Sequence, residues 1–138
     1  MTNQDQSAAQ EYSATADADT MAVRSIELDC PPTYVPQGGQ RTVTITSVDT
    51  SLKLFDLQHH WRVAIDDMVQ QGNSKACMEA SVLSDCSLEV RLIASLGAAL
   101  GDRVVRIYAC AKGEDPKKCK CDGGHQRFKS SNKPIIVT

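Results

Sequence analysis

A basic, cysteine-rich stretch lies near the end of the chain. "CAKGEDPKKCKCDGGHQRFKSSNK" (Cys110–Lys133) holds three of the six cysteines, seven Lys or Arg and three acidic residues. Thiolates and imidazole are the ligands of structural zinc, so Cys110, Cys119, Cys121 and His125 form a candidate set. The spacing C-x8-C-x-C-x3-H lacks paired C-x2-C knuckles, and one intervening residue points Cys119 and Cys121 apart in an extended chain. We therefore favour disulfides over a metal site and expect no metal and no cofactor.

The cysteine count indicates a disulfide framework, because an even number in a small chain is typical of an oxidising compartment. The predicted disulfide cysteines are Cys30, Cys77, Cys86, Cys110, Cys119 and Cys121. Six cysteines allow fifteen pairings, and the sequence alone does not choose among them. Cys77 and Cys86 fall on adjacent predicted strands joined by a turn, so we expect them to pair. Cys30 would then pair with one of the three cysteines of the basic stretch.

The same stretch supplies candidate binding residues, because binding side chains concentrate on loops held by a rigid scaffold. These candidates are Lys112, Lys117, Lys118, Lys120, His125, Arg127 and Lys129. Only Phe128 is interleaved for base stacking, and the sequence pI of 5.9 lies below neutral. Both observations argue against a nucleic-acid partner. We expect a protein or an anionic glycan instead.

Two further groups of polar residues carry weaker chemistry. His59 and His60 are adjacent and would point to opposite faces of a strand, so we expect partly exposed polar side chains. Asp66 and Asp67 could bind calcium with Asp49, but the D-x-D-x-D-G loop is missing, so we expect a solvated turn. No Ser-His-Asp order, glycine-rich phosphate loop or paired catalytic carboxylates stand out. We therefore expect that the protein is not an enzyme.

Short segments of period-two alternation must position these residues. They are rich in β-branched residues and separated by turn signals, which predicts an all-β, antiparallel sandwich. The expected strands cover residues 24–30, 40–48, 75–82, 86–94, 103–111 and 133–138. The segment "PPTYVPQGG" at 31–39 contains three prolines and two adjacent glycines, which predicts no regular pairing there.

Residues 52–71 fit two patterns. At 3.6 residues per turn, Leu54, Leu57, Trp61 and Ile65 share one face, which would make the fold α+β with one helix over 52–71. At period two, Trp61, Val63 and Ile65 alternate with His60, Arg62 and Ala64. We favour the strand, because the segments on both sides are strands and turns.

The chain length of 138 residues supports one domain. Residues 1–22 are poor in apolar side chains, so we expect a disordered tail or an artificial leader. Residues 23–138 would form a single β-sandwich domain with a long loop at 111–132. No run approaches the roughly 18 apolar residues of a membrane helix, so we expect no membrane insertion. We expect an extracellular or cell-surface location, with a signal peptide missing from this sequence.

Three segments carry a family resemblance: "CPPTYVPQGGQRTVTITSV", "SVLSDCSLEVRLIA" and "GDRVVRIYACA". Over about residues 25–111 the chain resembles immunoglobulin-like domains, most nearly the TIG type. It departs from the conventional pattern because Cys30 precedes the likely position of the usual first cysteine strand. The family has no catalytic residues to transfer. The resemblance implies a disulfide-stapled binding or adhesion module of receptors and adhesins. The alternative is an intracellular Rel-like or zinc-stabilised nucleic-acid-binding domain.

Overall fold

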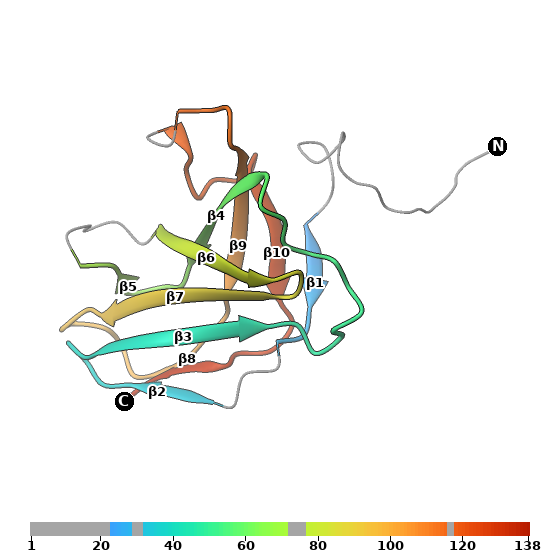
Figure 1. Cartoon of the computed structure of the whole chain (residues 1–138). Helices are drawn as coiled ribbons and strands as arrows, with labels where there is room; N and C mark the ends of the chain where they lie inside the picture. The colour runs from blue at the N-terminus through green and yellow to red at the C-terminus, as the bar shows by residue number, and fades with distance from the viewer. Residues whose placement is uncertain (1–22, 29–31, 72–76, 116–117) are drawn as a thin grey trace.

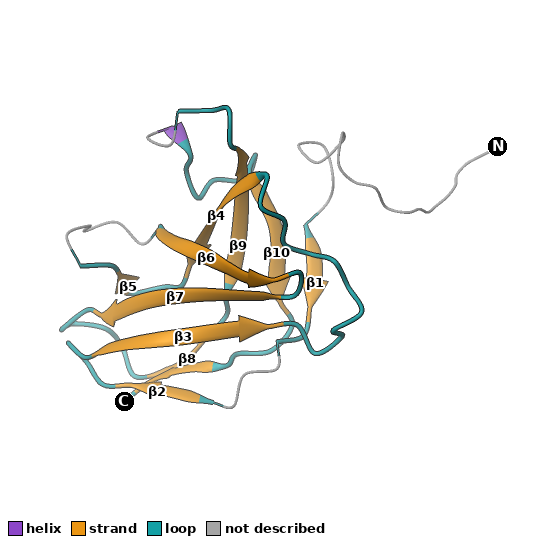
Figure 2. Ribbon diagram, viewed as in Figure 1, coloured by secondary structure: helices purple, strands orange, loops and turns teal. Residues whose placement is uncertain are grey.

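The computed structural model describes residues 23–28, 32–71, 77–115 and 118–138. This part of the chain forms two β-sheets and contains no α-helix (Figures 1 and 2). The predicted all-β, sandwich-like fold is confirmed. The alternative helix over 52–71 is wrong, because that segment contains the strands β4 (His59–Ala64) and β5 (Met68–Val69). The predicted tail at 1–22 lies outside the described residues.

The larger sheet follows the order β1-β10-β9-β4-β6-β7-β3, with β5 paired to β7. Its other strands are β1 (Arg24–Ile26), β3 (Gln40–Thr46), β6 (Met78–Ser84), β7 (Ser87–Ala94), β9 (Arg106–Ala111) and β10 (Gln126–Ser130). The smaller sheet has the order β2-β11-β8, from β2 (Thr33–Val35), β8 (Gly101–Arg103) and β11 (Ile135–Val137). Most pairs are antiparallel, but β1 runs parallel to β10 and β2 parallel to β11. The strand pairing is therefore mixed, not wholly antiparallel.

The core is built from the alternating apolar residues of these strands. On β7, Leu88, Val90 and Leu92 are buried, as the period-two pattern predicts. Val35, Ile135 and Val137 of the smaller sheet join the same apolar cluster as the strands of the larger sheet. Aliphatic side chains dominate this core because the chain has few aromatics. Burial of such faces is the main stabilising contribution to the fold.

β2 is a strand that the sequence analysis excluded. Pro36 follows β2 without interrupting it, so the three residues Thr33–Val35 pair with β11. An edge position tolerates flanking prolines, because only one side of the strand must pair. The chain then turns through Gly38, whose φ of 75° favours glycine. A Cβ there would also stand 2.6 Å from a methyl carbon of Leu96.

The predicted loop at 111–132 is shorter than expected, because it contains β10. This strand pairs with β9 on one side and β1 on the other. Its Phe128 is buried and lies among Phe55 and Trp61, with ring centroids 5.8 and 6.3 Å away. One aromatic in an otherwise polar segment therefore anchors a strand.

Among the described residues, no helix is long and apolar enough to span a bilayer.

Candidate functional site

Two disulfides hold the end of the larger sheet. Cys77 bonds to Cys121, with Cα atoms 5.6 Å apart and a sequence separation of 44. Cys110 bonds to Cys119, with Cα atoms 5.7 Å apart and a separation of nine. We call these the long bridge and the short bridge. The long bridge ties the segment after β9 to the residue before β6, and the short bridge ties it to β9 itself. Disulfides of this kind are typical of an oxidising compartment.

The predicted pairing of Cys77 with Cys86 is wrong. Ser84 pairs with Ser87 at the β6–β7 hairpin, so Cys86 lies in the turn itself. Cys77 lies directly before the first residue of β6, so the length of the strand separates it from Cys86. Cys86 has a free thiol.

Cys30 lies outside the described residues. Its predicted partners Cys110, Cys119 and Cys121 are all bonded elsewhere, so a bridge from Cys30 to any of them is also wrong. The one-residue spacing of Cys119 and Cys121 does have the expected consequence, because the two side chains reach different partners.

The bridges also exclude the zinc alternative. Zinc binds thiolates, and the three cysteines of that candidate set carry no thiolate when they are oxidised. His125, the fourth candidate, places Nδ1 2.9 Å from Oδ1 of Asp122. The side-chain hydrogen bond with His125 is the main cause that lowers the pKa of Asp122 below its ordinary value. His125 therefore fixes a turn at the end of the loop.

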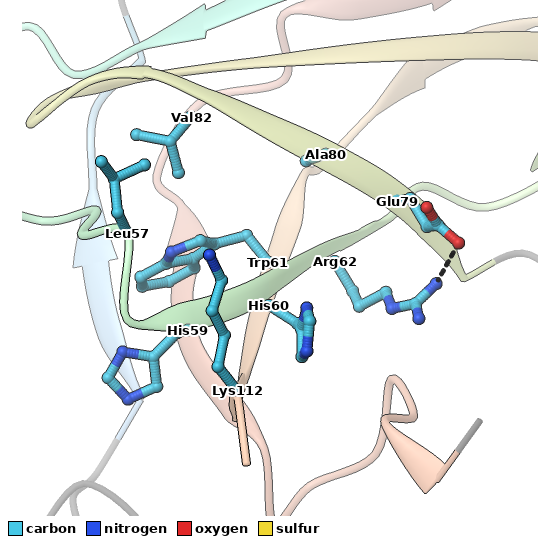
Figure 3. Close-up of a pocket in the computed structure, with 9 residues that line it drawn as sticks. All are labelled: Leu57, His59, His60, Trp61, Arg62, Glu79, Ala80, Val82 and Lys112. Atoms are coloured by element: carbon cyan, nitrogen blue, oxygen red, sulfur yellow. Dashed lines mark ion pairs between the residues drawn. The ribbon is translucent and has the colours of Figure 1, made fainter. Parts of the chain in front are cut away.

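A pocket opens where β4 and β6 separate. The two strands pair only through Trp61, Arg62 and Val63 against Met78, Glu79 and Ala80. Beyond Ala80, β6 continues to Ser84 with only β7 beside it in the described ladders. The pocket has a volume of about 390 Å³ (Figure 3). Its lining residues are Leu57, His59, His60, Trp61, Arg62, Glu79, Ala80, Val82 and Lys112. We call this the β4–β6 pocket.

Apolar side chains form one part of this pocket. Trp61 is 5% exposed, so this position of β4 is buried. Its Nε1–H donates to the carbonyl of Asp56 at 2.8 Å, and its ring packs edge to face with Phe55 at 5.1 Å. Leu57 is 70% exposed at the pocket edge. In Figure 3, Leu57 and Val82 lie near the indole on the side away from Glu79.

Cationic side chains form the other part. Arg62 on β4 reaches across to Glu79 on β6, with Nη1 3.4 Å from Oε2 (Figure 3). Lys112 is exposed and follows directly after β9. Its backbone N–H donates to Gln58 O at 3.2 Å, which ties it to the segment before β4. The short bridge at Cys110 fixes the chain two residues earlier. Basic groups thus outnumber the single carboxylate of Glu79 in the lining.

The structure distributes the sequence-predicted binding residues over several surfaces. Lys112 is the one among them that lines the β4–β6 pocket. Lys118 and Lys120 are exposed on the stapled loop, and Lys117 lies outside the described residues. Arg127 is half-buried on β10, where Nη1 donates to His125 O at 3.3 Å, and Lys129 is exposed on the same strand.

The pocket contains residues that the sequence analysis did not propose for binding. Arg62 and Glu79 were assigned only to strands, and Leu57 only to a possible apolar face. The alternation at 59–63 was a usable signal, because it places polar and apolar side chains on opposite sides of one strand. The separation of β4 from β6 had no sequence signal.

The two remaining polar candidates also have structural roles. His59 places Nδ1 2.8 Å from Asp56 Oδ1, and its ring lies 5.8 Å from that of Trp61. The Asp66–Asp67 turn faces two arginines, with Arg106 Nη2 2.8 Å from Asp66 and Arg103 Nη2 3.1 Å from Asp67. The turn is therefore held by ion pairs and is more than a solvated bend. Within the described residues, no group of three or more acidic, His or Cys side chains could hold a metal ion.

A scan against models of known protein families found no match, and a comparison with curated proteins found no significant relative.

Proposed function

We propose that this protein is a non-catalytic, extracellular binding module of immunoglobulin-like type, whose disulfide-stapled end engages a protein or an anionic glycan. The observation that carries the proposal is the β4–β6 pocket, in which an apolar side and a cationic side meet. Binding sites combine apolar side chains with placed polar groups, and this lining contains both. The fold alone would support no function.

The disulfides support the extracellular part of the proposal. Bridges persist in oxidising compartments and are rare where thiols are kept reduced. Here they also hold Lys112 beside the pocket, because the short bridge closes two residues before it. The two-sheet, all-β arrangement is compatible with the immunoglobulin-like resemblance and does not by itself indicate adhesion.

The alternative function, an intracellular nucleic-acid-binding domain, receives less support. Its zinc-stabilised form needs cysteines that are oxidised here, and the net charge of the whole chain is −2. Nucleic-acid binding domains present a basic face that neutralises phosphates. The basic residues here are spread over the loop, β10 and the pocket.

A matched pair of charge reversals tests the proposed site. The probes are a heparin-derived tetrasaccharide and the hexapeptide acetyl-(Glu-Val)₃-amide, with affinity measured by calorimetry under oxidising conditions. We expect Lys112→Glu to weaken binding of at least one probe about tenfold. Lys133→Glu makes the same charge change at an exposed position outside the pocket, so we expect a change below about twofold. Failure of both probes to bind, or equal losses in both variants, would overturn the proposal.

A further inference from the structure

The β4–β6 pocket lacks the feature that would select a sugar. Carbohydrates pack their apolar C–H faces on exposed aromatic rings. Trp61 is 5% exposed and stacks against Phe128 with ring planes 17° apart, so its face is occupied. Among the aromatic residues that the structure describes, Tyr34 is strongly exposed, at 57%, and it lies on the smaller sheet. An anionic glycan would therefore meet cations in this pocket without an aromatic platform.

The pocket instead combines apolar surface with two cationic side chains. Leu57 and Val82 offer aliphatic contacts, and Arg62 and Lys112 offer donors to an anion. The side chain of Glu79 is 76% exposed, so it can move away from Arg62 into solvent. A carboxylate from a ligand could then take its place, and charged hydrogen bonds of that kind are among the stronger ones. A ligand with both apolar and carboxylate side chains matches this lining.

The open edge of β6 adds a main-chain contribution. Ser81, Val82 and Ser84 pair with β7 on one side, with a register shift between Val82 and Ser84, and no strand in the described part pairs with their other side. The edge ends at Asp85, whose carbonyl accepts from Leu54 and Phe55, each at 2.8 Å. Unpaired strand edges bind extended peptides through backbone hydrogen bonds, while side-chain pockets give specificity. The regular part of this open edge is Ser81 and Val82, because the register shifts before Ser84, so the edge suits only a short segment.

We propose that the β4–β6 pocket binds a short extended peptide segment that carries a carboxylate, paired with Ser81 and Val82 of β6 and with its carboxylate beside Lys112 and Arg62. This inference rests on the proposed function and narrows its partner from a protein or an anionic glycan to an acidic peptide. Alternating side chains of an extended segment point to opposite faces. One face would therefore meet Leu57 and Val82 while the other carries the acid.

Three comparisons on the wild-type protein test the proposal. The hexapeptide acetyl-(Glu-Val)₃-amide should bind with a Kd of about 1 mM or tighter, and acetyl-(Lys-Val)₃-amide at least about tenfold more weakly. Two isomers of the acidic peptide carry N-methyl groups on alternate amides, either those of Glu or those of Val. Strand pairing uses alternate amides, so at least one isomer should lose about tenfold in affinity.

The outcomes separate this inference from the proposed function. If the heparin-derived tetrasaccharide binds at the pocket and the peptide does not, the proposed function stands and the peptide inference is overturned. Equal affinity of the parent peptide and both N-methylated isomers would overturn strand pairing. If neither the peptide nor the tetrasaccharide binds, both proposals fall. Binding of the acidic peptide with loss in one isomer supports both.

Discussion

Replacement of Trp61 by Phe separates the hydrogen bond of the indole from its packing. The indole N–H donates to the carbonyl of Asp56 at 2.8 Å, and the ring is 5% exposed. Loss of the hydrogen bond should cost about 1 kcal/mol and no more, because Asp56 is exposed and water can bind its carbonyl in the variant. The smaller ring leaves about 40 Å³, which at about 24 cal/mol per Å³ costs about 1 kcal/mol more. We therefore expect Trp61→Phe to lower the free energy of unfolding by about 2 kcal/mol.

Urea unfolding followed by circular dichroism measures this change without relying on tryptophan fluorescence. Trp61→Ala also removes the ring contacts with Phe55 and Phe128 and should cost about 3–5 kcal/mol. The difference in the free energy of unfolding between the two variants measures the packing of the phenyl ring that Trp61→Phe retains. A loss below about 0.5 kcal/mol for Trp61→Phe would show that the indole is neither bonded nor tightly packed. Equal losses for both variants would show that ring packing contributes nothing.

Three other perturbations test the supports around the site. Replacing both cysteines of either bridge by Ala should lower the free energy of unfolding, measured in urea, by about 2–4 kcal/mol. A chelator should leave the melting temperature unchanged, and unfolding by the chelator would contradict the assignment of the bridges. Arg103→Met should lower the free energy of unfolding by about 2–3 kcal/mol, because this side chain is 10% exposed and donates to Asp67 and several carbonyls. The same change at exposed Arg41 should be near neutral, and similar losses of stability in both variants would refute the role of Arg103. Asp122 has a depressed pKa in the folded protein, so its stabilising contribution is present above its unfolded pKa of about 3.9 and is lost as pH falls through the folded value. The stability difference between wild type and Asp122→Asn, below about 1 kcal/mol for this exposed pair, should therefore shrink on acidification from pH 6 to pH 2, and a constant difference would contradict the assignment.

The fold class could be predicted because strand periodicity is local. Leu88, Val90 and Leu92 alternate with polar residues, and the structure buries all three. The segment around Trp61 was ambiguous, since its apolar residues fit both periods. Neighbours on both sides decided it, because β4 pairs with β9 and β6.

The parallel pairs and the bridges could not be predicted, because they join distant parts of the chain. β1 meets β10 across about a hundred residues, and no local pattern specifies that register. The cysteine pairing failed for the same reason. Cys77 and Cys86 are close in sequence, but the hairpin register leaves them at opposite ends of β6.

The candidate site was predictable only in part. The charge of the stretch after β9 pointed to Lys112. The contribution of Arg62 and Glu79 depends on where β6 leaves β4, which is set by tertiary packing. The sequence therefore identified one cation of the site and not the pocket that it lines.

A nuclear magnetic resonance titration with acetyl-(Glu-Val)₃-amide tests the central claim most directly, because it locates binding residue by residue. We expect the backbone amide shifts to change first around residues 57–62, 79–84 and Lys112, under oxidising conditions. The loop at 95–100, where Leu96 and Leu100 are exposed, serves as the internal control and should not respond. Shifts concentrated on that loop or on the smaller sheet, or no shifts at millimolar peptide, would contradict the account of a binding site at the β4–β6 pocket.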